Sequence, residues 1–369
     1  MSEAIVSFED WTNWVLEPPY QAPALVGEQA LSALASAERQ TAIYLRRVHN
    51  SREITVINGP IRAIEEQVRR RHLLNQNSGP TARYGFVLGG PTRTGKTTVL
   101  QTFGKLFEQD LRTRHPERFI NEGLARYTPV VYYSLPQAAG EKTISKGLAD
   151  YLRVPYMPKE NEHDITVKVL KELQRIRTEF LLIDEIQNLG RHGDSPAGRR
   201  AGQRANDYMK NLCNKTSATP FFAGTKVEES GLFNEFHGSR VTQTSGRFTL
   251  LKTRPYGVAN DAELKQWREL ILALEKPLHL YKHQRGDLVK MAHYLHERTG
   301  GYVSTLSQLI REAAVLAIDS SNERIDRALL DTVEVDYLST EAYSDLQRQA
   351  TNATAKRAES ARQSRRRAG

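Results

Sequence analysis

The stretch from Tyr84 to Leu100, YGFVLGGPTRTGKTTVL, decides the fold of this 369-residue chain. It opens with a short apolar run that is typical of a buried β-strand. Gly90 to Thr97 then match the pattern G-x-x-x-x-G-K-[ST] at every fixed position, and Thr97 to Phe107 predict a helix. A glycine-rich loop between a strand and a helix is the context in which this pattern binds phosphates. We therefore predict an α/β fold with a nucleotide site at this loop.

Each residue type in the loop has a role in holding ATP. The glycines let the backbone curl, so that its N–H groups point at phosphate oxygens. Lys96 brings a positive charge to the β- and γ-phosphates, and Thr97 offers a hydroxyl ligand to Mg²⁺. The predicted cofactors are ATP and Mg²⁺. The predicted nucleotide-binding residues are Gly90, Pro91, Thr92, Arg93, Thr94, Gly95, Lys96, Thr97 and Thr98.

A second motif lies about 90 residues further along the chain. The apolar run from Phe180 to Ile183 ends in two carboxylates, Asp184 and Glu185. A central strand of a parallel sheet carries its functional side chains at its carboxyl end in this way. We predict that Asp184 holds Mg²⁺, directly or through water, and that Glu185 polarises the water that attacks the γ-phosphate.

Two further stretches carry candidate site residues. Thr225 follows the predicted strand TPFFAG, where it is placed to sense the γ-phosphate, although a threonine at a strand end also fits ordinary turn chemistry. Arg240 and Arg247 lie in SRVTQTSGRF. Either arginine is a candidate for reaching the nucleotide of a neighbouring subunit, or for pairing with a carboxylate of its own chain.

The composition indicates an anionic partner and a reducing compartment. The formal net charge is +9, and residues 352–369 contribute +5 of it through six basic residues against one acidic residue. A single cysteine, Cys213, excludes an internal disulfide. The acidic start MSEAIVSFEDW is unlike a signal peptide, and no run of about 18 apolar residues predicts a membrane span. We expect a cytoplasmic protein without a membrane partner.

Four segments are predicted from the distribution of residue types. Residues 1–60 form an aromatic and proline-bearing lead-in, which either docks a partner or packs on the domain that follows. Residues 61–255 form the α/β domain, and residues 256–338 form a helical domain. Its clearest helix is Val303 to Ile318, whose apolar face is predicted to consist of Leu306, Leu309, Ile310, Ala313, Ala314 and Ala317. Residues 339–369 form a basic tail that we expect to be disordered at its end.

The order of these motifs resembles that of AAA+ ATPases, and within that class it resembles the TniB/TnsC family of ATPase regulators of DNA transposition. The stretches that carry the likeness are GGPTRTGKTT, YYSLPQAAGEKTISKGLADYL, LLIDEIQNL, TPFFAGTKVEESG, and LVKMAHYLHERTGGYVSTLSQLIREAAVLAI followed by IDRALL. The resemblance implies an AAA+ P-loop NTPase with a parallel central sheet and a C-terminal helical lid.

The resemblance also implies roles for individual residues. Asp184 and Glu185 become the catalytic acids, Thr225 the first sensor, and Arg247 the finger that acts on a neighbour's ATP. The sequence departs from the common AAA+ pattern in one respect. Many AAA+ proteins place an arginine at the start of the penultimate lid helix. Here Gly300 to Thr305 contain none, and the next arginine is Arg311. That departure favours a slow, ATP-timed switch over fast turnover.

As partners, the resemblance implies double-stranded DNA, a transposase, a target-selection protein, and further copies of the chain in a ring or filament. Lys142 and Lys146 lie in the region that would face DNA, and Arg199 and Arg200 lie in a Gly/Arg-rich loop; a solvated surface explains these residues as well. Two alternatives remain at this point. One is another AAA+ nucleic-acid protein, such as a helicase loader or a replication initiator. The other is a nucleotide-switched signalling module that does not bind DNA.

Overall fold

The computed structural model describes residues 4–79, 83–120, 126–189, 196–227 and 245–336, with Ser339 and Tyr343. The chain divides into two compact units. An α/β unit consists of Met1–Pro19 and Ile57–Arg254, and a helical unit consists of Tyr20–Val56 and Pro255–Gly369. The chain therefore passes from one unit to the other three times.

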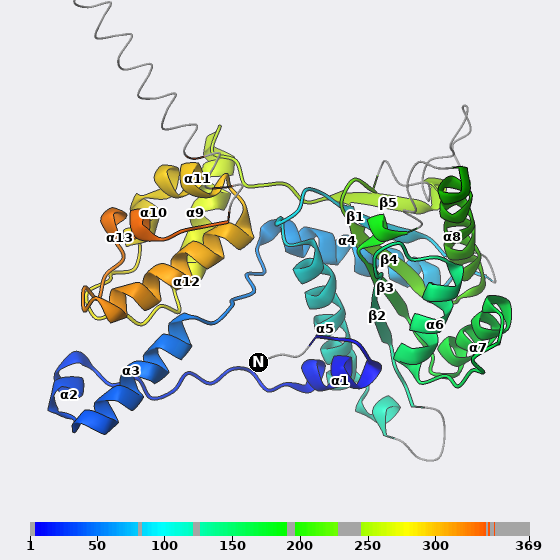
Figure 1. The fold of residues 1–369 in the computed structure, drawn as a ribbon, viewed down its shortest axis with the longest axis horizontal. Coiled ribbons are helices and arrows are strands. Elements are labelled where there is room, and N and C mark those ends of the chain that lie inside the picture. Colours follow the sequence, from blue (N-terminus) through cyan, green and yellow to red (C-terminus); the bar gives the residue numbers. More distant parts are fainter. Residues whose placement is uncertain are drawn as a thin grey trace, which may run out of the picture. The chain divides into compact units, whose positions relative to one another are not determined.

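The α/β unit is built on a five-stranded parallel sheet with the strand order β2-β3-β4-β1-β5 (Figure 1). The strands are β1 (Gly85–Gly89), β2 (Val130–Ser134), β3 (Phe180–Asp184), β4 (Thr219–Gly224) and β5 (Phe248–Lys252). Every residue of β1, β3 and β4 is buried, as expected for central strands covered on both faces. The predicted α/β fold with a parallel central sheet is confirmed. Because the strands are parallel, their carboxyl ends share one edge of the sheet.

Side chains on the two faces of the sheet join two separate cores. In β3, Leu181 and Ile183 pack among residues of α6, α7 and α8, whereas Phe180 and Leu182 pack among residues of α5. This alternation follows from the two-residue repeat of a strand. The helices and short 3₁₀ segments of this unit are α1 (Phe8–Leu16), α4 (Gly59–Gln76), α5 (Lys96–Arg114), η1 (Pro116–Phe119), α6 (Glu141–Leu152), α7 (Glu162–Arg175), η2 (Ile186–Asn188), α8 (Pro196–Lys215) and η4 (Ser245–Arg247).

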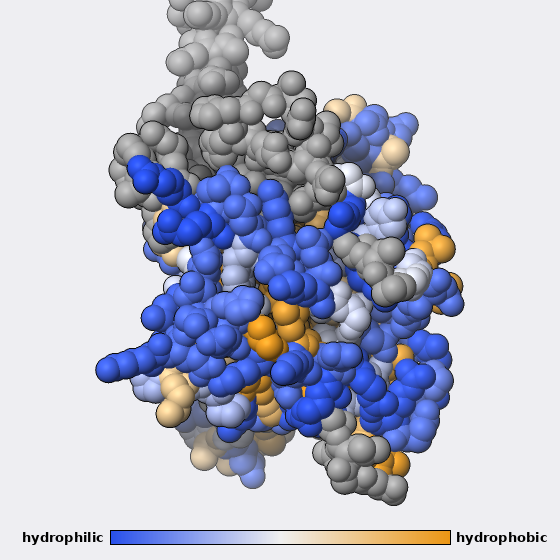
Figure 2. Space-filling model, turned by 90° about the vertical axis from the view of Figure 1, so that its right-hand side faces the viewer, coloured by the Kyte–Doolittle hydropathy of each residue, from blue (hydrophilic) through white to orange (hydrophobic). Residues whose placement is uncertain are grey.

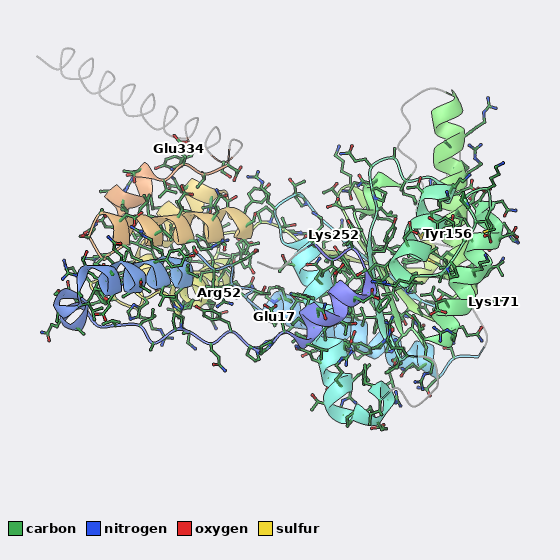
Figure 3. All side chains as sticks on the ribbon, turned by 60° about the horizontal axis from the view of Figure 1, so that its bottom comes forward. Glu17, Arg52, Tyr156, Lys171, Lys252 and Glu334 are labelled. Atoms are coloured by element: carbon green, nitrogen blue, oxygen red, sulfur yellow. The ribbon has the colours of Figure 1, made fainter. Side chains whose placement is uncertain are left out.

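The amino-terminal helix α1 packs on α5, the helix that follows the phosphate loop (Figures 1 and 3; Glu17, just after α1, is labelled in Figure 3). Trp11 is fully buried, and its Nε1 donates a hydrogen bond of 2.9 Å to Glu108 Oε2. Gly104 allows this close approach, since a Cβ at that position would lie 2.7 Å from the Trp11 ring. The first helix is therefore part of the core of the α/β unit.

The helix α4 is fastened at its end to the amino ends of β3 and β4. His72 Nδ1 lies 2.9 Å from Thr219 Oγ1, and its Nε2 lies 2.9 Å from Glu179 Oε2. Asn75 Nδ2 donates to the same threonine oxygen at 3.0 Å. These buried polar groups satisfy one another, which fixes the direction in which the chain enters β1.

The helical unit has its own apolar core around α12. The residues that were predicted to form the apolar face of this helix are all buried: Leu306, Leu309, Ile310, Ala313, Ala314 and Ala317. The helices of the unit are α2 (Glu28–Ala33), α3 (Ser36–Asn50), α9 (Asp261–Glu275), α10 (Asp287–Lys290), α11 (Ala292–Thr299), α12 (Val303–Asp319) and α13 (Arg327–Thr332).

A buried ion pair fastens α3 into the helical unit. The side chain of Arg46 is 1% exposed, and its guanidinium lies 2.5 Å from Glu323 Oε2. The same guanidinium lies 3.8 Å from the centre of the Tyr281 ring. The first 56 residues are therefore shared between two cores, residues 4–19 in the α/β unit and residues 20–56 in the helical unit.

We expect Arg46→Ala to destabilise the helical unit by about 3–5 kcal/mol, because the Glu323 carboxylate would stay buried without its partner. The neighbouring variant Arg47→Ala is the matched control. Arg47 pairs with Asp319, but both side chains are exposed, at 45% and 40%. Losing an exposed pair costs about 0–1 kcal/mol. Chemical denaturation measures the loss of stability in both variants, and hydrogen exchange of α3 and α12 shows whether the loss lies in the helical unit. Equal effects of the two variants would contradict a special role for the buried pair.

The surface of the α/β unit that carries α6, α7 and α8 is mostly hydrophilic, with a small hydrophobic patch near its middle (Figure 2). Among the described residues, no helix combines the length and apolar character needed to cross a membrane. The predicted basic tail, residues 339–369, lies outside the described residues apart from Ser339 and Tyr343.

Candidate nucleotide site

The loop between β1 and α5 has the backbone shape of an anion cradle. Gly90, Arg93 and Gly95 have positive φ angles of 157°, 66° and 80°. Alternation of this kind turns successive N–H groups toward a common point. Gly95 is also the N-cap of α5, a helix of 19 residues, so the positive end of the helix dipole faces the same place. Pro91, Thr92 and Thr97 are exposed, which leaves the mouth of the loop open.

Lys96 connects the loop to the end of β3. Its side chain is buried, and its Nζ donates to the Pro91 carbonyl oxygen at 2.5 Å. Burial lowers the pKa of Lys96, and the nearby carboxylates of Glu185 and Asp184 oppose that shift. The ammonium group and both carboxylates are therefore electrostatic neighbours, although Lys96 begins α5 and the carboxylates lie at the end of β3.

Thr253, just after β5, holds the loop from the other side. Its backbone N donates to the Gly89 carbonyl oxygen at 2.8 Å, and its Oγ1 lies 2.7 Å from Thr94 Oγ1. A Cβ at Gly90 would lie 2.2 Å from Thr253 Oγ1, so this position requires glycine. The sequence alone does not predict Thr253 as a site residue, because only the pairing of β5 with β1 brings it to the loop.

Asp184 is held at the end of β3 by two donors. It is 2% exposed; its Oδ2 accepts from Tyr132 Oη at 3.2 Å and its Oδ1 from the Glu185 backbone N at 2.8 Å. Burial, with the adjacent Asp184 carboxylate, raises the pKa of Tyr132, so its hydroxyl stays a donor. The Tyr132 ring stacks on Trp11 with a centroid distance of 5.7 Å. The amino-terminal helix therefore contacts Tyr132, the side chain that donates to Asp184.

Glu185 and Thr225 are connected through Gln187, a residue that was not predicted to belong to the site. The Gln187 Nε2 donates to Glu185 Oε2, and the Gln187 Oε1 accepts from the Thr225 backbone N at 2.9 Å. The parallel pairing of β3 with β4 brings the two strand ends together. The only sequence signal was the position of a glutamine two residues after the predicted base.

The donor set fits Mg²⁺ and a triphosphate. A hydroxyl at Thr97 and a carboxylate at Asp184 are hard oxygen ligands of the kind that Mg²⁺ takes with phosphate oxygens. Lys96 and the amino end of α5 supply positive charge for the phosphates. The site therefore combines the groups needed to bind a nucleotide with a carboxylate, Glu185, that can accept a proton.

Comparison with known proteins identifies the family. The family model described as "Bacterial TniB protein" matches residues 60–253, more than half of the chain. The chain belongs to the TniB family. A search among curated proteins found no match for it.

Solved structures show the fold of this TniB-family chain. The ORC2 protein of Aeropyrum pernix in its ADPNP–ADP complexes is 16% identical, with a TM-score of 0.54 over 77% of this chain and 70% of that one. In the ADP form, the same protein is 15% identical, with a TM-score of 0.55 over 81% and 72% of the two chains. At this identity the likeness shows the fold alone. It agrees with the predicted architecture of an α/β unit with a parallel sheet and a helical unit.

Of the remaining predicted site residues, Arg247 lies away from the phosphate loop, because the next residue, Phe248, pairs with Gly85 at the opposite end of β1. Arg247 is in η4, where its Nη1 donates to Asn214 Oδ1 at 2.8 Å. Arg240 and the side chain of Arg199 are outside the described part of the chain, and Arg200 is exposed on α8. In the lid, Arg311 Nε donates to the Ser51 carbonyl oxygen at 2.7 Å.

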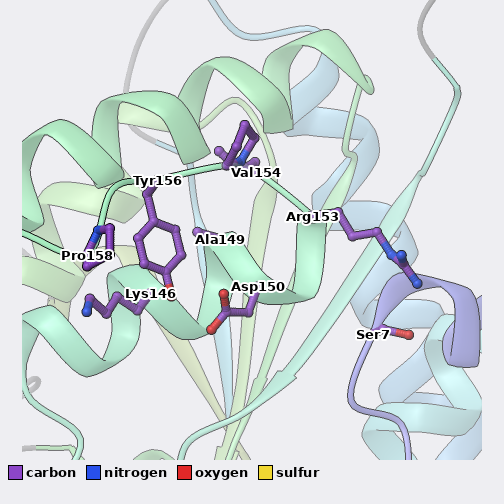
Figure 4. A pocket seen from close by; sticks show the side chains of 9 residues that line it. Ser7, Lys146, Ala149, Asp150, Arg153, Val154, Tyr156 and Pro158 are labelled. Carbon is purple, nitrogen blue, oxygen red and sulfur yellow. The ribbon is translucent and has the colours of Figure 1, made fainter. Parts of the chain in front are cut away.

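Lys142 and Lys146 lie one turn apart on α6. Lys142 is exposed, and Lys146 Nζ lies 5.4 Å from the centre of the Tyr156 ring. Lys146 lines an open groove of about 720 Å³ together with Asp150, Arg153 and Tyr156 (Figure 4). The groove thus combines two cations with one carboxylate beside an aromatic ring.

Proposed function

We propose that this TniB-family protein is an ATPase that oligomerises on double-stranded DNA with ATP bound, and that it recruits or activates a transposase. The observation that supports the ATPase activity is the convergence of Lys96, Asp184 and Glu185 at one edge of the sheet. The oligomer, the DNA and the transposase are proposed from the family to which the chain belongs.

In the proposed reaction, water attacks the γ-phosphorus of ATP and the bond from that phosphorus to the β–γ bridging oxygen breaks. Glu185 accepts the proton of the attacking water, while Lys96 binds the phosphates. Mg²⁺, held by Thr97 and Asp184, would neutralise charge on the phosphate oxygens. Thr225 is proposed to sense the γ-phosphate from the end of β4. The absence of an arginine between Gly300 and Thr305 supports slow turnover.

For DNA, we propose phosphate contacts from α6 and the start of α8. Lys142 and Lys146 are four residues apart and so share one face of α6. Arg204 Nε of α8 lies 3.4 Å from Glu141 Oε1, which places the two helices next to each other on this side of the sheet. Arg200 of α8 adds an exposed cation. These groups suit sequence-independent binding to a phosphate backbone.

Electron microscopy with duplex DNA tests the proposal. We expect ordered assemblies only when both DNA and a non-hydrolysable ATP analogue are present, and none with Lys96→Ala. Neutralising Lys142 and Lys146 together should reduce the slope of log affinity against log salt by about two, because each phosphate contact releases about one counterion. The ATPase rate without DNA should be unchanged. Assemblies that form equally well without DNA, or an unchanged salt slope, would contradict the proposed DNA contacts.

The same assemblies, assayed for ATPase activity and for stimulation of a transposase, distinguish the proposed function from its two alternatives. A nucleotide-switched signalling module would assemble without DNA, and its ATPase would not respond to DNA. A helicase loader or replication initiator would assemble on DNA but would not stimulate a transposase in a strand-transfer assay. Stimulation that requires ATP and Lys96 supports the transposition role.

A further inference from the structure

We propose that Gln187 is a positioning residue that orients the carboxylate of Glu185 by coupling it to the end of β4. The inference deepens the proposed ATPase function and rests on it. Gln187 lies in η2, directly after the predicted base, and its side-chain amide contacts both Glu185 and Thr225. It joins the group that is proposed to activate water to the strand end that is proposed to sense the γ-phosphate.

The backbone brings Gln187 back alongside Glu185. Glu185 has a left-handed conformation with φ 56° and ψ 39°, which costs free energy in a residue with a side chain. The turn is held by a hydrogen bond of 2.8 Å from the Asn188 backbone N to the Glu185 carbonyl oxygen. Ile186 is fully buried and anchors the turn to the core. The strained turn therefore brings the side chain of Gln187 back to the side chain of Glu185.

The side-chain amide of Gln187 suits the chemistry of the two contacts. The Gln187 Nε2 donates to a carboxylate, and the Gln187 Oε1 accepts from a backbone N–H. Only a group that carries both a donor and an acceptor makes these two bonds at once. A glutamate at this position would keep the acceptor and lose the donor, and a methionine would lose both.

Gly224 leaves room for the amide. A Cβ at this position would lie 2.5 Å from Gln187 Oε1 and 2.6 Å from Ile186 Cγ2. The last residue of β4 is thus shaped to receive the side chain that contacts the base. Because β4 lies next to β3 in the sheet, a shift at the end of β4 moves the hydrogen-bond partner of Gln187, and with it the carboxylate.

The test compares Gln187→Glu and Gln187→Met with the wild-type protein. We expect kcat for ATP to fall at least about tenfold in both variants, because a base that is misplaced by about 1 Å loses up to a hundredfold in rate. The dissociation constant of a fluorescent non-hydrolysable ATP analogue should stay within about twofold of wild type, since Lys96 and the loop are untouched. Thermal unfolding checks that the variants fold.

Asn188→Ala is the matched control. Asn188 is in the same turn, and its backbone bond to Glu185 is kept in the alanine variant. The Asn188 Nδ2 donates to the Leu135 carbonyl oxygen at 2.9 Å and not to the Glu185 carboxylate. We expect this variant to lower the unfolding temperature while kcat stays at the wild-type value. If the wild-type protein hydrolyses ATP and both Gln187 variants match its kcat, the positioning role is wrong. If the wild-type protein hydrolyses no ATP, the proposed function itself fails.

Discussion

Replacing Glu185 with glutamine is expected to slow ATP hydrolysis about 10²- to 10⁴-fold while ATP binding is retained. The substitution keeps the size of the side chain and removes only its capacity to accept a proton. Lys96, which is proposed to hold the phosphates, and Asp184, which is proposed to hold Mg²⁺, are unchanged. The protein should therefore stay in its ATP-bound state and remain assembled on DNA. Single-turnover hydrolysis and the binding of a fluorescent ATP analogue measure the two effects separately.

Lys96→Ala is the companion variant, because it should lose nucleotide binding itself. Lys96 is the buried cation of the loop, and its removal leaves the phosphates without their nearest positive charge. The two variants should then differ in assembly, with Glu185→Gln assembled and Lys96→Ala dispersed. Hydrolysis by Glu185→Gln at the wild-type rate would show that Glu185 is not the base.

The second large effect is expected at Arg247, which we propose acts on the ATP of a neighbouring subunit. Its guanidinium donates to the neutral amide oxygen of Asn214 on α8, and the following Phe248 stacks on Phe222 with a centroid distance of 5.2 Å. The stacked ring anchors the chain next to the arginine. Arginine fingers contribute about 10³–10⁵ in rate in GTPases, so Arg247→Ala should be almost inactive.

Mixing Arg247→Ala with Lys96→Ala subunits tests whether the site is shared. Each variant is inactive alone for a different reason. In a mixed assembly, an intact Lys96 on one subunit meets an intact Arg247 on its neighbour, and part of the ATPase activity should return. A mixture that assembles but stays as inactive as either variant would exclude Arg247 as the finger. Arg240 would then be the candidate to examine.

The main parts of the candidate site could be predicted because their signals are local. The loop from Gly90 to Thr97 needs its glycines, lysine and threonine at fixed spacing. All of these residues lie within eight consecutive positions of the sequence. Asp184 and Glu185 follow an apolar run that is buried along its whole length. Both patterns depend only on residues that are close together in the sequence, so the strand order is not needed to recognise them.

The supports of the site could not be predicted, because they depend on the strand order. Thr253 contacts Thr94 across 159 positions of sequence, since β5 pairs with β1. Tyr132 reaches Asp184 because β2 pairs with β3. Gln187 is near Glu185 in the sequence, but its second contact, with Thr225, exists only because β4 lies beside β3.

The sequence by itself determined the α/β class, the phosphate loop, the two carboxylates at the end of β3 and the apolar face of α12. Each of these is a pattern of residue types that lie close together in the sequence. The tertiary structure decided how the first 56 residues are used. Trp11 finds its hydrogen-bond partner 97 positions away, and Arg46 finds its partner 277 positions away, in different units. The physical reason is that a buried polar group is stable only beside its partner. That partner is chosen by the packing of the whole chain.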